Sequence, residues 1–198
     1  IGTTALLEFK LVRTQQETKS IIDKLDTYFA AHPPAGIDST RRKAAFSSHL
    51  LSIDVIGAFV PEEEMAAVQA LLATPGIDSI VPGDSQLQWG QAETMSEGSL
   101  SGRRLYVLKR EAEMKGGSVA TATAEVGLER NNPGAWGVSM KLTPAGRMDF
   151  SRITGANINR NLAIVLDGVV NSAPVIKDQI PSGEAQITGG SFTAQSAR

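Results

Sequence analysis

Residues 162–172 consist of two short apolar runs separated by the dipeptide Asp167-Gly168. A two-residue hairpin turn needs positive φ at both central positions, and Asp-Gly adopts that geometry readily. The segment therefore predicts an antiparallel hairpin with strands at 162–166 and 169–172, and hence a fold that contains an antiparallel sheet. Pro174 cannot donate to a strand ladder, so we expect the return strand to leave the sheet or to lie at its edge.

Segments before this hairpin predict both strands and helices. Apolar and polar residues alternate over residues 3–12, which is typical of a strand, while residues 15–31 carry apolar residues at helical spacing. Residues 50–60 are rich in β-branched residues and predict a strand. We expect a helix to follow, with Pro61 as its first residue, and then a short strand at 77–81.

The remaining patterns complete the predicted architecture. Residues 125–142 indicate a hairpin with a longer turn, and Thr143-Pro144 is typical of a helix start that continues to about Ala156. Residues 93–104 are polar and rich in serine and glycine, which favours a linker. The order of elements predicts an α+β fold. We expect a ferredoxin-like base sheet from residues 1–14 and 105–198, with residues 15–104 inserted as an α+β head lobe.

Composition excludes several kinds of site. The chain has no cysteine, so disulfides, thiolate catalysis and zinc-thiolate sites are excluded. A net charge of −2 and an aromatic content of 5% argue against a nucleic-acid partner. No apolar stretch approaches the roughly 20 residues that span a bilayer. The chain starts with Ile1 rather than methionine and ends abruptly, so we interpret it as a fragment of a longer protein.

Residues suited to catalysis are few. His32 and His49 have no histidine or glutamate nearby at the spacing of a metal or catalytic site. We therefore expect no enzymatic activity, no metal and no cofactor. The alternative is a hydrolase or transferase that uses carboxylates, for which the candidates are Glu125, Glu129, Asp149 and Asp167. That alternative requires two of them to meet in one pocket.

One stretch is specific enough to suggest a family. Residues 162–176, with the sequence LAIVLDGVVNSAPVI, resemble the signature of the SecD family of protein-export membrane proteins, and the resemblance extends through residues 180–193. It also covers LTPAG at 142–146 and IGTTALLEF at 1–9, whereas residues 194–198 depart from the family pattern. Within the signature, we expect Asp167, Gly168, Ser172, Ala173 and Pro174 to be structural.

The resemblance implies a role in protein export. Members of this family are integral inner-membrane subunits that act with SecF beside the SecYEG channel. Their first periplasmic domain has a base and a head, and the head is thought to contact unfolded preprotein and to swing about a hinge, driven by proton flow. The chain would then lie on the periplasmic face of the bacterial inner membrane. We expect the hinge near residues 12–15 and 93–104.

The candidate preprotein-contacting residues lie in the predicted head. Apolar residues of one strand and one helix would form an exposed concavity or an unpaired strand edge. They are Ile53, Val55, Ile56, Phe59, Leu71 and Leu72. The competing interpretation is that all six form the core of that lobe. At the level of function, the alternative is a periplasmic scaffold domain of another multi-component membrane transporter.

Overall fold

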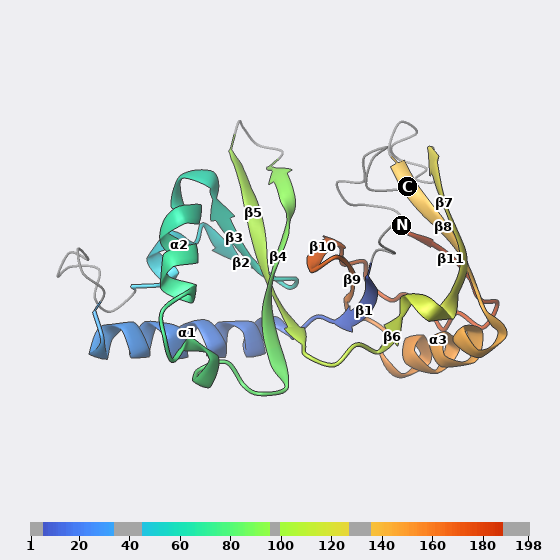
Figure 1. Ribbon diagram of the computed structural model, residues 1–198, viewed down its shortest axis with the longest axis horizontal. Helices are drawn as coiled ribbons and strands as arrows, with labels where there is room; N and C mark the ends of the chain where they lie inside the picture. The colour runs from blue at the N-terminus through green and yellow to red at the C-terminus, as the bar shows by residue number, and fades with distance from the viewer. Residues whose placement is uncertain (1–5, 34–44, 96–99, 127–135, 188–198) are drawn as a thin grey trace, which may run out of the picture. The chain divides into compact units, whose positions relative to one another are not determined.

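The computed structural model describes residues 6–33, 45–95, 100–126 and 136–187 (Figure 1). The chain forms two compact units. Unit 1 comprises residues 1–12 and 111–198, and unit 2 comprises residues 13–110. Both units combine strands with helices, which confirms the predicted α+β class. The names base and head, and the ferredoxin-like form of the base, stay predictions.

In its described residues, unit 2 forms a four-stranded antiparallel sheet with two α-helices. Its strand order is β2-β3-β5-β4. The elements are α1 (Gln15–Ala31), β2 (Ser52–Ile53), β3 (Ala58–Pro61), α2 (Met65–Leu72), β4 (Ser85–Thr94) and β5 (Ser101–Lys109), with 3-10 helices at Ser47–His49, Glu62–Glu64 and Ile77–Ser79.

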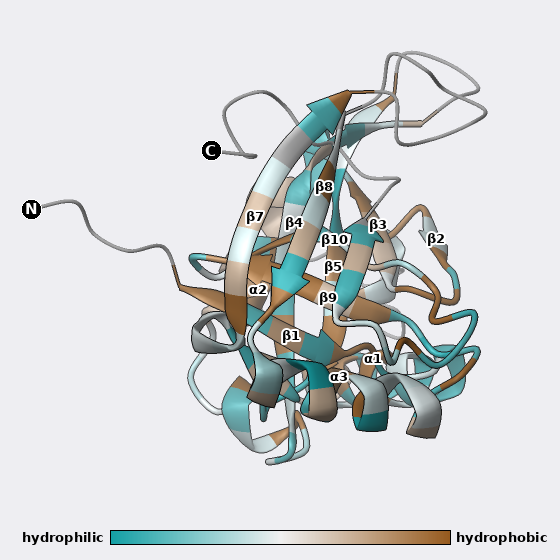
Figure 2. Cartoon of the chain, turned by 90° about the vertical axis from the view of Figure 1, so that its right-hand side faces the viewer, coloured by the Kyte–Doolittle hydropathy of each residue, from teal (hydrophilic) through white to brown (hydrophobic). Residues whose placement is uncertain are grey.

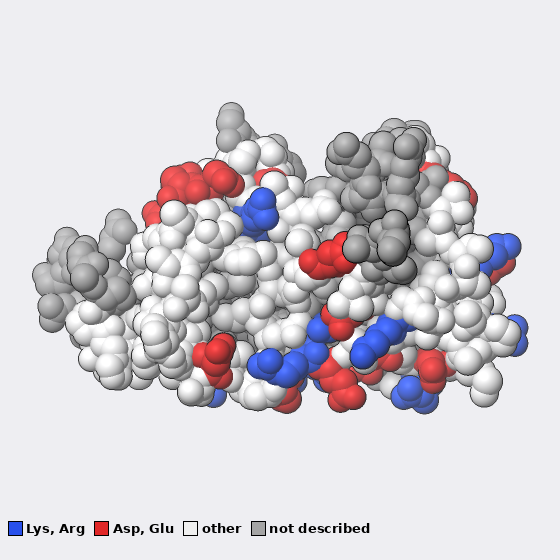
Figure 3. Space-filling view, in the orientation of Figure 1, with Lys and Arg blue, Asp and Glu red and all other residues white. Residues whose placement is uncertain are grey.

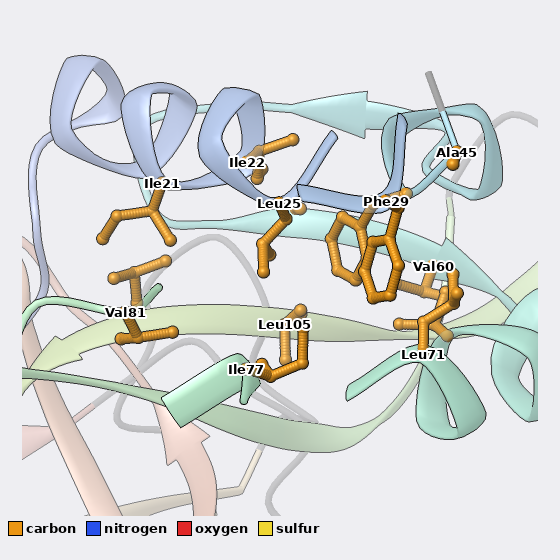
Figure 4. Packing of buried hydrophobic residues seen from close by; sticks show 14 of the residues in the cluster. Ile21, Ile22, Leu25, Phe29, Ala45, Val60, Leu71, Ile77, Val81 and Leu105 are labelled. Carbon is orange, nitrogen blue, oxygen red and sulfur yellow. The ribbon is translucent and has the colours of Figure 1, made fainter. Parts of the chain in front are cut away.

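Helix α1 confirms the helix predicted over residues 15–31. It begins with a capping box in which the Thr14 side chain accepts a hydrogen bond from the Glu17 amide, and the Glu17 carboxylate accepts one from the Thr14 amide. Its apolar stripe, which includes Ile21, Leu25 and Phe29, is buried against β3, β5 and α2 (Figure 4). This packing forms the core of unit 2.

The single strand predicted over residues 50–60 is wrong, because the segment folds as the β2–β3 hairpin. The Asp54 carboxylate accepts hydrogen bonds from the amides of Ile56 and Gly57, at 2.9 and 3.2 Å, and stabilises the turn. The β-branched Val55 and Ile56 concealed this turn in the sequence. Pro61 ends β3 and precedes the 3-10 helix, so α2 starts only at Met65.

Two further predictions in unit 2 are wrong. The strand predicted at 77–81 is a 3-10 helix, Ile77–Ser79, which follows a left-handed Gly76. The linker predicted at 93–104 belongs largely to the long β4–β5 hairpin, where Thr94 pairs with Ser101 and Glu93 with Gly102. Serine, glycine and arginine are tolerated in these strands because backbone hydrogen bonds, rather than apolar burial, hold the end of the hairpin.

The described part of unit 1 contains two antiparallel sheets and one α-helix. The first sheet has the order β10-β9-β1-β6 and the second the order β11-β8-β7. The elements are β1 (Leu7–Leu11), β6 (Met114–Lys115), β7 (Val119–Val126), β8 (Trp136–Leu142), α3 (Pro144–Ala156), β9 (Leu162–Leu166), β10 (Val169–Ser172) and β11 (Glu184–Ile187), with a 3-10 helix at Gly116–Ser118.

The alternating pattern of β1 sets the core of unit 1. Hydrophobic and hydrophilic residues alternate along this strand (Figure 2), so that Phe9 and Leu11 are buried. The Phe9 ring meets the Phe150 ring of α3 edge to face, with 6.2 Å between centroids. The predicted helix start is confirmed, since the Thr143 hydroxyl accepts a hydrogen bond from the Gly146 amide and Pro144 is the first helical residue.

Strands β9 and β10 form the predicted hairpin around Asp167-Gly168. Both turn residues have positive φ, 47° and 79° respectively. The Asp167 carboxylate also accepts a hydrogen bond from the Leu6 amide at 2.8 Å. Strands β7 and β8 pair as a hairpin, but β7 covers Val119–Val126 rather than the predicted 125–130. Residues 127–135, which include most of that predicted strand and its turn, lie outside the described residues, as do residues 3–5 of the predicted first strand.

We expect Gly168→Val to reduce the free energy of unfolding by about 1–2 kcal/mol, because a β-branched residue resists positive φ. The measurement is a thermal melt compared with that of Gly117→Val. Gly117 also lies in unit 1, but it does not need positive φ and a Cβ there meets no atom within 4 Å. Equal melting temperatures for the two variants would contradict the structural role of Gly168.

Candidate functional site

The six predicted contact residues do not share one surface. Phe59 and Leu71 are buried, with 0% and 5% of their surface exposed. Ile53 and Leu72 are partly buried and pack against the core of unit 2. Val55, in contrast, is 62% exposed at the tip of the β2–β3 hairpin. Phe59 and Leu71 are therefore core residues, as the competing interpretation holds. A contact role for the exposed part of the hairpin stays a prediction.

A groove of about 620 Å³ lies beside this hairpin in unit 2. One side is polar and comes from the start of α1, and the other is apolar and comes from the segment that leads into β2. The lining includes Gln15, Gln16, Lys19, Leu50, Leu51 and Ile53. Strand β2 is an outer strand of the unit 2 sheet, and the Gln15 side chain donates to the Ile53 carbonyl at 3.0 Å. Leu51 is 52% exposed.

A cluster of charged residues that the sequence did not reveal lies on the sheet of unit 2. Arg104 forms ion pairs with Asp54 at the β2–β3 turn and with Glu93 on β4. The Arg104 Nε–Glu93 Oε1 distance is 3.3 Å, but neither atom makes a hydrogen bond among the described residues. Asp54 and Glu93 are 50 and 11 positions from Arg104 in the sequence, so no local motif predicts the cluster.

Tyr106 lies close to this cluster and is 6% exposed. Burial, which disfavours the tyrosinate, raises the pKa of Tyr106 from its ordinary value of 10.0 to about 12. The Arg104 charge acts in the opposite direction, and the Glu93 and Asp54 charges act in the same direction as burial. The ring covers Gly90, where a Cβ would lie 2.8 Å from a ring carbon.

We expect this pKa to make unit 2 lose stability at high pH. The pKa of Tyr106 is higher in the folded state than in the unfolded state. Its contribution to the free energy of unfolding is therefore complete below pH 10 and is lost as the pH rises from 10 towards 12. The loss is on the order of 2 kcal/mol. Urea unfolding at pH 8 and pH 11.5 tests this, with Tyr106→Phe as the control that lacks the titrating group. If both proteins lose the same stability, Tyr106 does not carry the effect.

The family-signature residues lie in the β9–β10 turn, at the end of β10 and directly after it. Asp167 and Gly168 form the turn, and Ser172 ends β10, where a register shift leaves Asn171 as an extra residue. The chain then leaves the regular strand at Ala173 and Pro174, as Pro174 predicts. The Asn161 side chain donates to the Ala173 carbonyl at 2.7 Å, and the Leu162 amide donates to the Pro174 carbonyl at 3.0 Å. Predicted structural roles for these residues are consistent with this geometry.

A second concavity, of about 510 Å³, lies within unit 1. Residues of β1, β8, α3, β9 and β11 and of the segment 174–180 line it, and most of them are apolar. Sequence analysis missed it, because its walls come from elements up to 177 positions apart in the chain, from Phe9 to Gln186. The signal that was available is the apolar run Pro174-Val175-Ile176, which follows the hairpin without belonging to a regular strand.

The carboxylates of the enzyme alternative are dispersed in the described part of the chain. Asp149 lies 3.6 Å from Arg152 on the exposed side of α3, Asp167 belongs to the hairpin turn, and Glu125 is exposed on β7. None of the three lines either concavity, and Glu129 lies outside the described residues. No group of three histidine, aspartate or glutamate side chains within the described ranges is suited to hold a metal ion.

Two surface properties concern nucleic acid and membrane as partners: the distribution of charged side chains, and the length and hydropathy of the helices. On the face shown in Figure 3, lysine and arginine side chains are dispersed, and most of them have acidic side chains nearby. Among the residues that the structure describes, no helix is both long enough and apolar enough to cross a membrane.

Comparison with known proteins finds similarity to SecD and SecDF in both a family model and individual relatives. The family model described as "SecDF, P1 head subdomain" matches residues 92–198. Protein translocase subunit SecD of Calditerrivibrio nitroreducens is 39% identical over 118 residues, which are 60% of this chain and 22% of that protein. SecD of Endomicrobium trichonymphae is 30% identical over 201 residues, with 100% and 32% of the two chains covered. The chain thus spans a fifth to a third of these relatives.

A solved structure is also similar to this chain. It comes from a study of the structure and function of a membrane component SecDF that enhances protein export. It is 19% identical, covers 96% of this chain and 89% of the solved chain, and superimposes with a TM-score of 0.39. The residues matched by the family model include part of unit 2 and most of unit 1, and the assignment of base and head to the two units stays a prediction.

Proposed function

Because this chain belongs to the SecD/SecDF family of protein translocase subunits, we propose that it is an extracytoplasmic domain that binds unfolded preprotein during export. In this proposal the full-length protein sits in the bacterial inner membrane, with this part on the periplasmic face. It acts with SecF and the SecYEG channel and uses the proton-motive force through segments outside this chain. The domain itself handles polypeptide and performs no chemistry.

The observation that carries the proposal is the groove beside the β2–β3 hairpin of unit 2. Exposed apolar side chains at Leu51 and Val55 can contact the apolar residues that an unfolded chain exposes. The polar side of the groove, formed by Gln15, Gln16 and Lys19, can accept or donate hydrogen bonds along the peptide backbone. Such a surface tolerates many sequences, which suits a protein that must act on many clients.

Movement of one unit against the other is part of the proposal. Because residues 93, 94 and 101–104 lie in the paired strands β4 and β5, we do not assign the hinge to the segment 93–104. The chain passes between the units only twice, at 12–13 and at 110–111. Hinges are a few loop residues that absorb changes in backbone dihedral angles. We therefore place the hinge at these two crossings.

Site-specific photo-crosslinking in membrane vesicles tests the proposal. A photoreactive residue replaces Leu51 or Val55 in the full-length protein, and a preprotein is stalled in the channel. We expect crosslinks from both positions, and background from Gln69, an exposed residue of α2 outside the groove. Equal crosslinking from all three positions would contradict a defined contact surface. Its complete absence from both test positions would favour a scaffold role without client contact in this groove.

A further inference from the structure

We propose that unit 1 holds a second polypeptide-binding site, formed by its apolar cavity and the open edge of β11. The cavity of about 510 Å³ is within the range of about 300–1,000 Å³ that is typical of ligand pockets. Its lining includes Phe9, Phe150, Ile164, Ile176, Ile180 and Ala185. The identity of the partner, an unfolded polypeptide, rests on the proposed function. The site itself is separate from the groove in unit 2.

Strand β11 offers unpaired backbone groups at the rim of the cavity. It is an outer strand of the second sheet and pairs with β8 alone among the described strands. The Leu142 amide donates to the Gly183 carbonyl at 2.8 Å, so Ala185, two residues on, also directs its backbone groups towards β8. Glu184 and Gln186 therefore direct theirs to the opposite side.

Gln186 is the free position on this edge. Both backbone groups of Glu184 lie 3.3 Å from the Ser182 hydroxyl, which occupies them. The Gln186 N–H and C=O have no such partner in the described part of the chain, and Gln186 lines the cavity. An extended peptide can therefore add to β11 by two hydrogen bonds with Gln186, the mode known as β-augmentation.

This geometry also defines the side chains of the partner. A peptide residue paired with Gln186 points to the same side as the Gln186 side chain, which is exposed. Its two neighbours point to the same side as Ala185, which is 8% exposed and lines the cavity. The site therefore fits an extended segment with large aliphatic residues at positions i and i+2.

The charge of the site agrees with such a partner. Lys177 and Asp178 are the charged residues of the lining, and their charges are opposite. An uncharged apolar segment matches a lining that is mostly apolar and carries no net charge, whereas a charged side chain would lose hydration among the apolar residues of the cavity. The edge and the cavity thus both favour uncharged, apolar stretches of an unfolded chain.

Two substitutions test the site on the whole 198-residue chain. Gln186→Pro removes the outward N–H, and proline is tolerated on an edge strand where that N–H does not bond to the neighbouring strand. Gln186→Ala is the matched control, because it changes the side chain and keeps the backbone groups. Ala185→Leu fills the cavity from within and serves as an independent variant, with thermal melts to check folding.

The probe is a fluorescein-labelled peptide with leucines at i and i+2 between serines and threonines, and the readout is fluorescence anisotropy. Gln186→Pro is expected to weaken binding about tenfold through the loss of one or two hydrogen bonds, and Ala185→Leu by a similar factor through the loss of the apolar contact. Gln186→Ala is expected to leave binding unchanged. A peptide of equal composition with leucines at i and i+3 is expected to bind more weakly.

The outcomes separate this inference from the proposed function. If Gln186→Pro and Ala185→Leu bind the peptide as the unaltered chain does, while Val55→Asp in unit 2 abolishes binding, the inference is wrong and the proposed function stands. If Gln186→Pro does not fold, the result with Ala185→Leu decides. If the unaltered chain does not bind the peptide at all, both ideas lose their support.

Discussion

Phe29→Ala is expected to reduce the free energy of unfolding of unit 2 by about 3–5 kcal/mol, the usual cost of deleting a fully buried phenylalanine side chain. The Phe29 ring is completely buried between α1 and the sheet (Figure 4) and meets the Tyr28 ring edge to face at 5.3 Å. Its removal leaves a cavity that rigid neighbours on several elements cannot fill.

Urea unfolding followed by tryptophan fluorescence measures this effect. In a Trp136→Phe background, Trp89 of β4 is the remaining tryptophan, and it packs against the core of unit 2. Val55→Ala is the control, because it removes an exposed apolar side chain and should change stability by less than about 0.5 kcal/mol. A loss below about 1 kcal/mol for Phe29→Ala would show that Phe29 is not part of a close-packed core.

Gly146→Ala is expected to destabilise unit 1 by about 3 kcal/mol, although alanine is normally the better helix former by about 1 kcal/mol. Gly146 lies in the first turn of α3, and a Cβ there would lie 2.3 Å from the Ser118 carbonyl oxygen. That oxygen is held in place, because it accepts a hydrogen bond from the Thr143 amide at 2.9 Å. The clash therefore has to displace backbone.

Gly155→Ala in the same helix provides the matched comparison. Its Cβ would meet the side chain of Gln179, at 3.1 Å, and that side chain can move. We expect Gly155→Ala to leave stability unchanged or to raise it by up to about 1 kcal/mol. Thermal and urea unfolding of the two variants give the difference, and a Gly146→Ala variant as stable as Gly155→Ala would contradict the close approach of Ser118 to α3.

The elements that sequence predicted correctly have a local cause. Asp167-Gly168 specifies its turn through backbone angles, and Thr143-Pro144 specifies the start of α3 through a cap and a fixed φ. Both signals act over a few residues, so they can be recognised without knowledge of the tertiary contacts. The β2–β3 turn is also local, through the Asp54 carboxylate, but the β-branched residues inside it resemble a continuous strand.

The parts that sequence did not predict depend on distant contacts. The polar end of the β4–β5 hairpin resembles a linker, and it becomes recognisable as paired strands only through the register that joins Thr94 to Ser101. The two concavities and the Arg104 cluster bring together residues from separate elements, for which a single sequence carries no periodic signal. The candidate contact residues stay a prediction for the same reason: the sequence predicted one strand where the β2–β3 hairpin forms, and it did not distinguish the buried Phe59 from the exposed Val55.

The discontinuous composition of unit 1 has a consequence for the order in which the chain matures. Strand β1 pairs with β9, so that Leu7 meets Leu166 across 159 positions, whereas the pairs β2–β3, β3–β5 and β4–β5 close within residues 13–110. A chain that emerges from its N-terminus can complete unit 2 first, while β1 waits for its partner. Early folding of unit 2 then shortens the flexible loop that β1–β9 pairing has to close, and lowers its entropic cost. Because unit 2 is inserted into unit 1, its early folding favours the later pairing of β1 with β9.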